Sequence, residues 1–114
     1  MREKGIKGED KAVSHLKLKG YRIVERNYRT PFGEVDVIAE RDGVMIFVEV
    51  KSRSKDRAEE AFTLSKAKRL YKSAMVYLAS KGLLDHPFRF DLIAISDDEL
   101  EHYENILWED GVIG

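Results

Sequence analysis

The pattern of apolar and polar positions divides the chain into two helices and at least four strands. Apolar residues recur at helical spacing over 6–18 and 65–81, and a glycine follows each segment. Strand-like runs cover 21–28, 34–40, 44–51 and 88–95, and we expect a short edge strand within 100–107. Helices mixed with such strands predict an α/β (α+β) fold in which helices flank a central sheet.

The length and composition add limits to this picture. The 114 residues suit a single domain over 1–114, and the absence of cysteine excludes disulfides, thiolate zinc sites and cysteine nucleophiles. We find no apolar stretch long enough to span a bilayer and no signal-peptide pattern at the start, so we expect a soluble, cytoplasmic protein.

Charge is distributed unevenly along the chain. Residues 1–72 carry 18 Lys and Arg against 12 Asp and Glu, whereas residues 73–114 carry 2 against 9. A basic first part permits a face that binds phosphates, although charges of this kind also solvate ordinary helix surfaces. The asymmetry therefore allows a nucleic-acid partner without establishing one.

Glu49 interrupts the most apolar strand of the chain, MIFVEV at 45–50. A strand that is apolar on both faces is typical of the middle of a covered sheet, where a carboxylate is costly unless it is paired or binds a metal. Lys51 lies two residues further on and therefore on the same face. A salt bridge between Glu49 and Lys51 is the simpler interpretation, and a reactive site is the alternative.

The predicted hairpin favours the reactive site. If Asp42 and Gly43 form a two-residue turn, Asp36 lies directly opposite Glu49. Opposed like charges destabilise a sheet, and a divalent cation between the two carboxylates removes the repulsion. Ligands that offer only oxygen atoms suit Mg²⁺ or Mn²⁺.

Glu9 is a third candidate acid. It falls on the apolar stripe of the first helix, where a carboxylate is unusual. An alternative is that it merely stabilises the helix N-terminus through the helix dipole.

Four short motifs carry a resemblance that covers nearly the whole chain: GE at 8–9, GEVDVI at 33–38, FVEVKSR at 47–53 and RFD at 89–91. In these motifs the chain resembles the YraN-like family, whose pattern belongs with the PD-(D/E)xK nucleases and is similar to archaeal Holliday-junction resolvases. The resemblance implies a restriction-endonuclease-like fold, with a mixed five-stranded sheet in the order αβββαβ(β).

The resemblance also implies an activity, the metal-dependent hydrolysis of phosphodiester bonds in DNA, including branched or junction DNA. Asp36 and Glu49 match the metal-binding acids, the carbonyl of Val50 would bind the same Mg²⁺ or Mn²⁺, and Lys51 matches the motif lysine. Glu9 matches a helical glutamate that many members use directly or through water. Relatives of this size often pair, so the resemblance makes a homodimer plausible.

Basic side chains that follow the third strand form the expected DNA-binding surface. They are Arg53, Lys55, Arg57, Lys66, Lys68, Arg69 and Lys72. Two alternatives stay open: a nucleic-acid-binding module that lacks catalysis, and a protein-interaction subunit that uses the acidic tail at 97–110. The three histidines show no ligand spacing, and we assign them no role.

Overall fold

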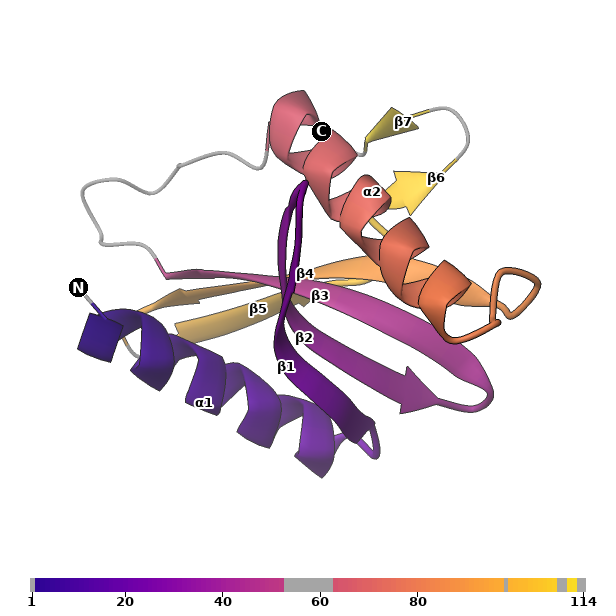
Figure 1. Cartoon of the computed structure of the whole chain (residues 1–114). Helices are drawn as coiled ribbons and strands as arrows, with labels where there is room; N and C mark the ends of the chain where they lie inside the picture. The colour runs from indigo at the N-terminus through magenta and orange to yellow at the C-terminus, as the bar shows by residue number, and fades with distance from the viewer. Residues whose placement is uncertain (1, 53–62, 98, 109–110, 113–114) are drawn as a thin grey trace.

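A five-stranded sheet lies between two helices (Figure 1). The computed structural model describes residues 2–52, 63–97, 99–108 and 111–112. The helices are α1 (Arg2–Leu18) and α2 (Leu64–Ser80), which cover opposite faces of the sheet. The side-chain hydroxyl of Thr63 caps α2 by accepting the N–H of Lys66 at 3.2 Å. The second helix is shifted by one residue from the predicted range 65–81, and the first ends at the predicted residue 18 but begins at residue 2, four residues earlier than predicted.

The sheet has the strand order β1-β2-β3-β4-β5, which is also the order along the chain. Its strands are β1 (Arg22–Thr30), β2 (Gly33–Arg41), β3 (Val44–Ser52), β4 (Phe88–Ser96) and β5 (Glu99–Tyr103). β3 and β4 are parallel and are joined through α2, whereas the other neighbouring strands are antiparallel. The mixed five-stranded sheet, the order αβββαββ and the short edge strand are therefore confirmed.

A second, two-stranded sheet was not predicted. It pairs β6 (Leu107–Trp108) with β7 (Gly111–Val112). Strands of two residues are too short to show an alternating pattern, so the sequence offers no signal for them. The N–H of Ile106 donates to the carbonyl of Phe90 at 2.7 Å and holds this tail against β4.

The turn between β2 and β3 sets the register that matters for function. Asp42 and Gly43 both have positive φ, at 53° and 79°, as a two-residue hairpin turn of this type requires. Arg41 pairs with Val44, and the pairing continues to Val37 with Val48. This is the predicted register. Just beyond the pair of Val37 and Val48, the side chain of Asp36 accepts the N–H of Val50 at 2.8 Å.

Apolar side chains fill the space on both faces of the sheet. Ile46 and Val48 of β3 belong to the core under α1, whereas Met45 and Phe47 belong to the core under α2. Because side chains alternate along a strand, Glu49 and Lys51 continue the row that faces α2.

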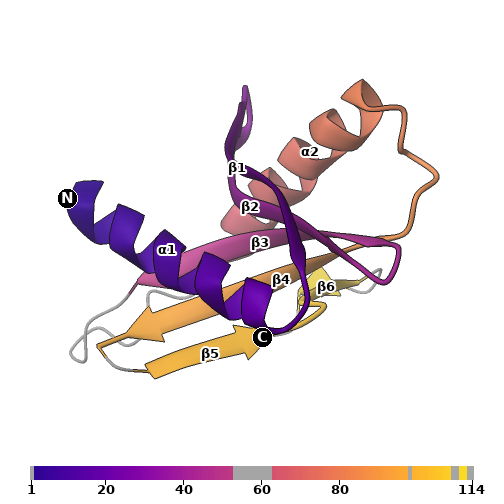
Figure 2. The same cartoon turned by 90° about the horizontal axis from the view of Figure 1, so that it is seen from below.

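The hairpin of β1 and β2 twists out of the sheet and rises beside α2 (Figures 1 and 2). The register of β1 shifts between Ile23 and Glu25, and such bulges increase local twist. Near the tip, the Oγ1 atom of Thr30 lies 2.8 Å from the Oγ atom of Ser73 on α2. The twist carries the outer half of β2 away from β3 and opens the sheet beside Asp36.

No described helix is long and apolar enough to cross a membrane.

Candidate metal and nucleic-acid site

Three acidic side chains meet where the sheet opens. Glu9 comes from α1, and Glu34 and Asp36 come from β2. Each offers a carboxylate oxygen, and these oxygens lie within 4.8 Å of one another. Glu34 and Asp36 share a side of β2 because they are two residues apart. Glu34 is exposed, whereas Glu9 and Asp36 are half-buried.

Asn27 joins two of these acids. Its side-chain amide donates to both oxygens of Glu9, at 3.0 and 3.1 Å, and to Glu34 at 2.9 Å. The residue has a φ of 52°, a conformation that asparagine tolerates better than most side chains. In the register of β1 with β2, Asn27 falls opposite Asp36. The irregular backbone of β1 therefore turns an amide toward the carboxylates.

Arginine side chains bracket the outer edge of the cluster. Arg26 forms an ion pair with Asp10 at 2.7 Å and lies 3.7 Å from Glu9. Arg29 lies 3.9 Å from Glu34. These cations are more than a third exposed, so water screens much of their attraction for the acids.

Asp36 is the acid that its surroundings destabilise most clearly as an anion. Burial raises its pKa, the charge of Glu49 raises it further, and the net value is about 8. The N–H bond from Val50 acts in the opposite direction, and Glu9 and Glu34 add to the increase. The charges that act on Asp36 are thus those of other acids. A positive charge placed among these acids would lower the pKa of Asp36.

The pKa of Glu49 is subject to influences in both directions. Burial raises its pKa, while the charges of Lys51 and Lys66 lower it, and the net direction is upward. Glu49 lies close enough to act strongly on Asp36, but its carboxylate is not part of the group of three oxygens. The structure therefore brings Glu49 and Lys51 beside the cluster.

Glu9 and Asp36 come together as expected. Glu34 joins them, although we had not assigned it as a ligand; its spacing of two residues from Asp36 was the available signal. The N–H of Val50 is bound to Asp36, and the role of its carbonyl stays a prediction.

Part of the predicted DNA-binding surface can be located on α2. The charges of Lys66 and Arg69 both lower the pKa of Glu49, so both residues lie near enough to act on that acid. Lys68 and Lys72 are exposed. Arg53, Lys55 and Arg57 lie outside the described residues.

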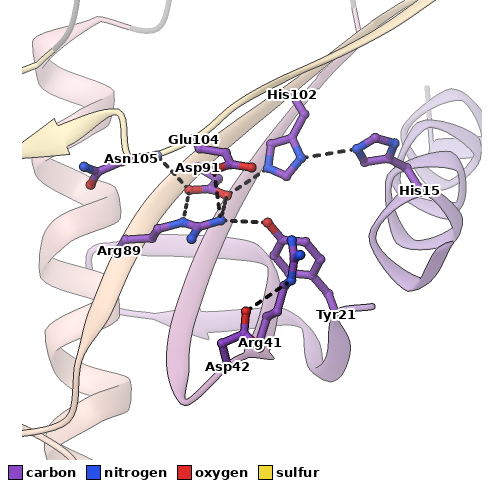
Figure 3. A network of polar contacts seen from close by, with 9 residues as sticks. All are labelled: His15, Tyr21, Arg41, Asp42, Arg89, Asp91, His102, Glu104 and Asn105. Atoms are coloured by element: carbon purple, nitrogen blue, oxygen red, sulfur yellow. Dashed lines mark hydrogen bonds and ion pairs between the residues drawn. The ribbon is translucent and has the colours of Figure 1, made fainter. Parts of the chain in front are cut away.

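A separate polar network lies between the sheet and α1 (Figure 3). Asp91 of β4 is fully buried and accepts two hydrogen bonds from Arg89, at 3.0 and 3.1 Å. It also contacts Nε2 of His102 at 2.8 Å and accepts the N–H of Asn105 at 2.9 Å. Burial alone would raise the pKa of Asp91, but the bonds from His102 and Arg89 hold it below its usual range.

The network extends to α1 through two histidines. Nδ1 of His102 lies 3.2 Å from Nε2 of His15, and Arg89 donates to the hydroxyl of Tyr21 at 2.7 Å. A carboxylate can only accept, so His102 donates to Asp91 through Nε2. Burial lowers the pKa of His15. These histidines, to which we had assigned no role, tie α1 to the two last strands of the sheet; they lie 87 residues apart in sequence.

Comparison with known proteins identifies the family to which the chain belongs. The model of the uncharacterised protein family UPF0102 matches residues 8–95. The chain belongs to the UPF0102 family. This confirms the resemblance to YraN-like proteins that the four motifs carry. The matched region includes the three clustered acids, Glu49, Lys51 and the buried Asp91.

Individual UPF0102 proteins are similar over most of their length. One from Sulfurihydrogenibium sp. (strain YO3AOP1) is 40% identical over 90% of this chain and 92% of its own length. One from Fusobacterium nucleatum is 41% identical over 97% and 96%. One from Thermotoga neapolitana is 44% identical over 88% and 92%. Membership of UPF0102, an uncharacterised family, gives no activity, so the chemistry must be argued from the site.

Proposed function

We propose that this protein is a metal-dependent nuclease that hydrolyses phosphodiester bonds in DNA. The observation that carries the proposal is the convergence of Glu9, Glu34 and Asp36, whose oxygens lie within 4.8 Å of one another. Glu49 and Lys51 stand beside them on β3. Acids clustered next to a lysine are what the resemblance to PD-(D/E)xK nucleases implies.

The residues present fit a divalent cation. All the candidate ligand atoms are oxygens, which suits Mg²⁺ or Mn²⁺. The pKa of Asp36, raised to about 8, is the second indication. Burial and the neighbouring acids both penalise its ionised form, and a bound cation would offset that penalty. Asp36, Glu9 and Glu34 would hold the ion, and the family pattern adds Glu49 and the carbonyl of Val50.

Each group then has a chemical role. When bound, the cation supplies Lewis acidity and lowers the pKa of a coordinated water. Lys51 orients the attacking water or stabilises the negative charge that develops on the phosphate. Lys66 and Arg69 bind the phosphates on either side of the scissile bond.

The test is cleavage of labelled four-way-junction, flap, single-stranded and duplex DNA in Mg²⁺ or Mn²⁺. The variants are Asp36→Asn and Lys51→Ala, with Lys17→Ala as a matched control because Lys17 is exposed on α1. Circular dichroism checks that all variants fold. We expect cleavage by the wild type and the control, and its loss in both site variants.

Two other results would replace the proposal. Binding that weakens with salt, without cleavage in either metal, indicates a nucleic-acid-binding module. Neither binding nor cleavage indicates the protein-interaction subunit, in which case replacing the exposed tail acids Glu99 and Glu101 by lysine should abolish association with its partner.

A further inference from the structure

An exposed aromatic ring stands at the tip of the hairpin that carries the acids. Phe32 lies in the turn between β1 and β2 and is 43% exposed. Its N–H donates to Oγ1 of Thr30 at 3.0 Å, and the Thr30 hydroxyl donates to the carbonyl of Gly33 at 3.0 Å. Because that hydroxyl has one proton, Ser73 must donate to Thr30 across 2.8 Å. The turn is therefore fastened both to itself and to α2.

One cation from α2 lies over this ring, and a second basic residue of the same helix packs beside the turn. The ammonium nitrogen of Lys72 lies 5.4 Å from the ring centroid of Phe32. Next to the turn, Gly33 has a φ of 145° and packs closely on α2: a Cβ atom placed there would lie 3.8 Å from Cβ of Arg69. The charge of Arg69 also acts on Glu49. One face of α2 thus connects the ring with the acids.

The ring is also close to the acids along β2. Asp36 is four residues beyond Phe32, and at about 3.3 Å per strand residue the two backbones are roughly 13 Å apart. That is a span of a few nucleotides at about 3.4 Å per nucleotide along one stacked strand. A strand whose phosphate lies at the acids and that runs along β2 toward the hairpin tip therefore reaches the ring within a few nucleotides.

Other exposed apolar side chains lack this setting. In the described part of the chain, the side chain of Phe32 is more than a third exposed and also has a cation over its ring. Tyr21 and Tyr77 also have cations over their rings, but both are buried. Proteins that bind single-stranded nucleic acids combine aromatic rings, on which bases stack, with basic side chains along the backbone path. In an intact duplex the faces of the bases are already stacked and are not available to such a ring.

We infer that Phe32 stacks on an unpaired nucleobase of the strand whose backbone passes the acids. The substrate is then DNA that has unpaired nucleotides within a few positions of the scissile phosphate, as in a flap or an opened junction. This inference rests on the proposed function for the cleavage step. The stacking contact itself is measured separately, as binding.

The experiment measures the binding of fluorescently labelled oligonucleotides by anisotropy, in EDTA so that no cleavage occurs. Phe32→Ala is compared with the wild type, with Phe32→Tyr as the conservative variant and with Leu84→Ala as a control for loss of an exposed apolar side chain. We expect Phe32→Ala to bind single-stranded and flap DNA about 10-fold more weakly and blunt duplex within about twofold. Phe32→Tyr and Leu84→Ala should bind as the wild type does.

An abasic nucleotide moved along the single strand tests the contact directly. At one position it should weaken the wild type about as much as Phe32→Ala does, and it should have no further effect on Phe32→Ala. Single-stranded RNA of the same sequence distinguishes a base contact from a preference for DNA. Equal losses on duplex and single strand, no loss in Phe32→Ala, or no single-strand binding by the wild type would each overturn the inference.

The outcomes also separate this inference from the nuclease proposal. Selective loss of single-strand binding in a protein that cleaves nothing retains the stacking contact and rejects the nuclease. Cleavage that requires Asp36, without selective loss in Phe32→Ala, retains the nuclease and rejects the stacking contact.

Discussion

Replacing Asp36 by asparagine separates what the acidic cluster costs in stability from what it does in chemistry. The asparagine side chain keeps the size of the aspartate, and its carbonyl oxygen can still accept the N–H of Val50, now 2.8 Å from Oδ2. It cannot carry the negative charge that Glu49, Glu9 and Glu34 oppose. We therefore expect Asp36→Asn to stabilise the metal-free protein and to abolish metal binding.

The magnitude follows from the pKa of Asp36. In the folded chain the pKa is about 8, whereas the usual value is 3.8. Between these values the folded protein binds more protons than the unfolded chain does, so the free energy of unfolding of the wild type falls as the pH rises. From pH 5 to pH 8 this amounts to about three pH units at roughly 1.4 kcal/mol each, or ~4 kcal/mol. The amide introduced by Asp36→Asn does not titrate, so the variant loses nothing by this route.

The assay is urea denaturation of both proteins in EDTA at pH 5, 7 and 9. The stability advantage of Asp36→Asn should grow by about 2–4 kcal/mol between pH 5 and pH 9. Asp36→Ala is the control, because it removes the charge but also leaves the Val50 N–H without its acceptor, at a cost of about 1 kcal/mol or more. Added Mn²⁺ should then stabilise the wild type alone, by about 2.7 kcal/mol at 100 times its dissociation constant.

A constant difference across this pH range would refute the reasoning about Asp36, because the carboxylate would then ionise in the folded protein as it does in water. An Asp36→Asn protein that Mn²⁺ stabilises as much as the wild type would remove Asp36 from the metal site.

Three further predictions use other residues. Lys51→Met should lower the single-turnover cleavage rate about 100-fold or more while junction affinity stays within about threefold; an unchanged rate would contradict a role in the reaction. Asn27→Gly, which suits the positive φ, should weaken Mn²⁺ binding about 10-fold or more by calorimetry because Glu9 and Glu34 lose their shared donor. Burial lowers the pKa of His15, so the contribution of its neutral form to stability is fully present above about pH 6.5 and is lost as the pH falls. Between pH 7 and pH 5 the urea-measured stability of His15→Gln should therefore rise relative to that of the wild type, and an equal change in the two proteins would argue against this role.

The parts of this protein that local sequence determines were predictable. Asp42 and Gly43 define the turn, the turn defines the register of β2 with β3, and the register brings Asp36 beside Glu49. The helical period placed Glu9 on the buried side of α1 in the same way. In each case a short-range rule was sufficient, because the residues concerned lie within one helix or one hairpin.

Other features depend on contacts that no local rule describes. Asn27 reaches the acids because β1 adopts a positive φ inside a strand, which its residue type permits but does not require. The contact between His15 and His102 exists only because α1 packs across the sheet, and its two members show no common period. The place of Glu34 in the acidic cluster lay between these cases, since its spacing from Asp36 was visible in the sequence but the twist of the hairpin was not.

The two partly or fully buried aspartates of the sheet make opposite use of the fold, and the contrast bears on function. Asp91 accepts bonds from Arg89, His102 and the Asn105 amide, and its pKa is lowered. Within the described residues Asp36 accepts one bond, from Val50, and faces other acids, and its pKa is raised. The fold therefore stabilises the ionised form of Asp91 with hydrogen-bond donors and positive charge, and it does not do so for Asp36. Natural sequences break local consistency mainly where a site needs it, and at Asp36 the missing compensation is positive charge, which a divalent cation would provide.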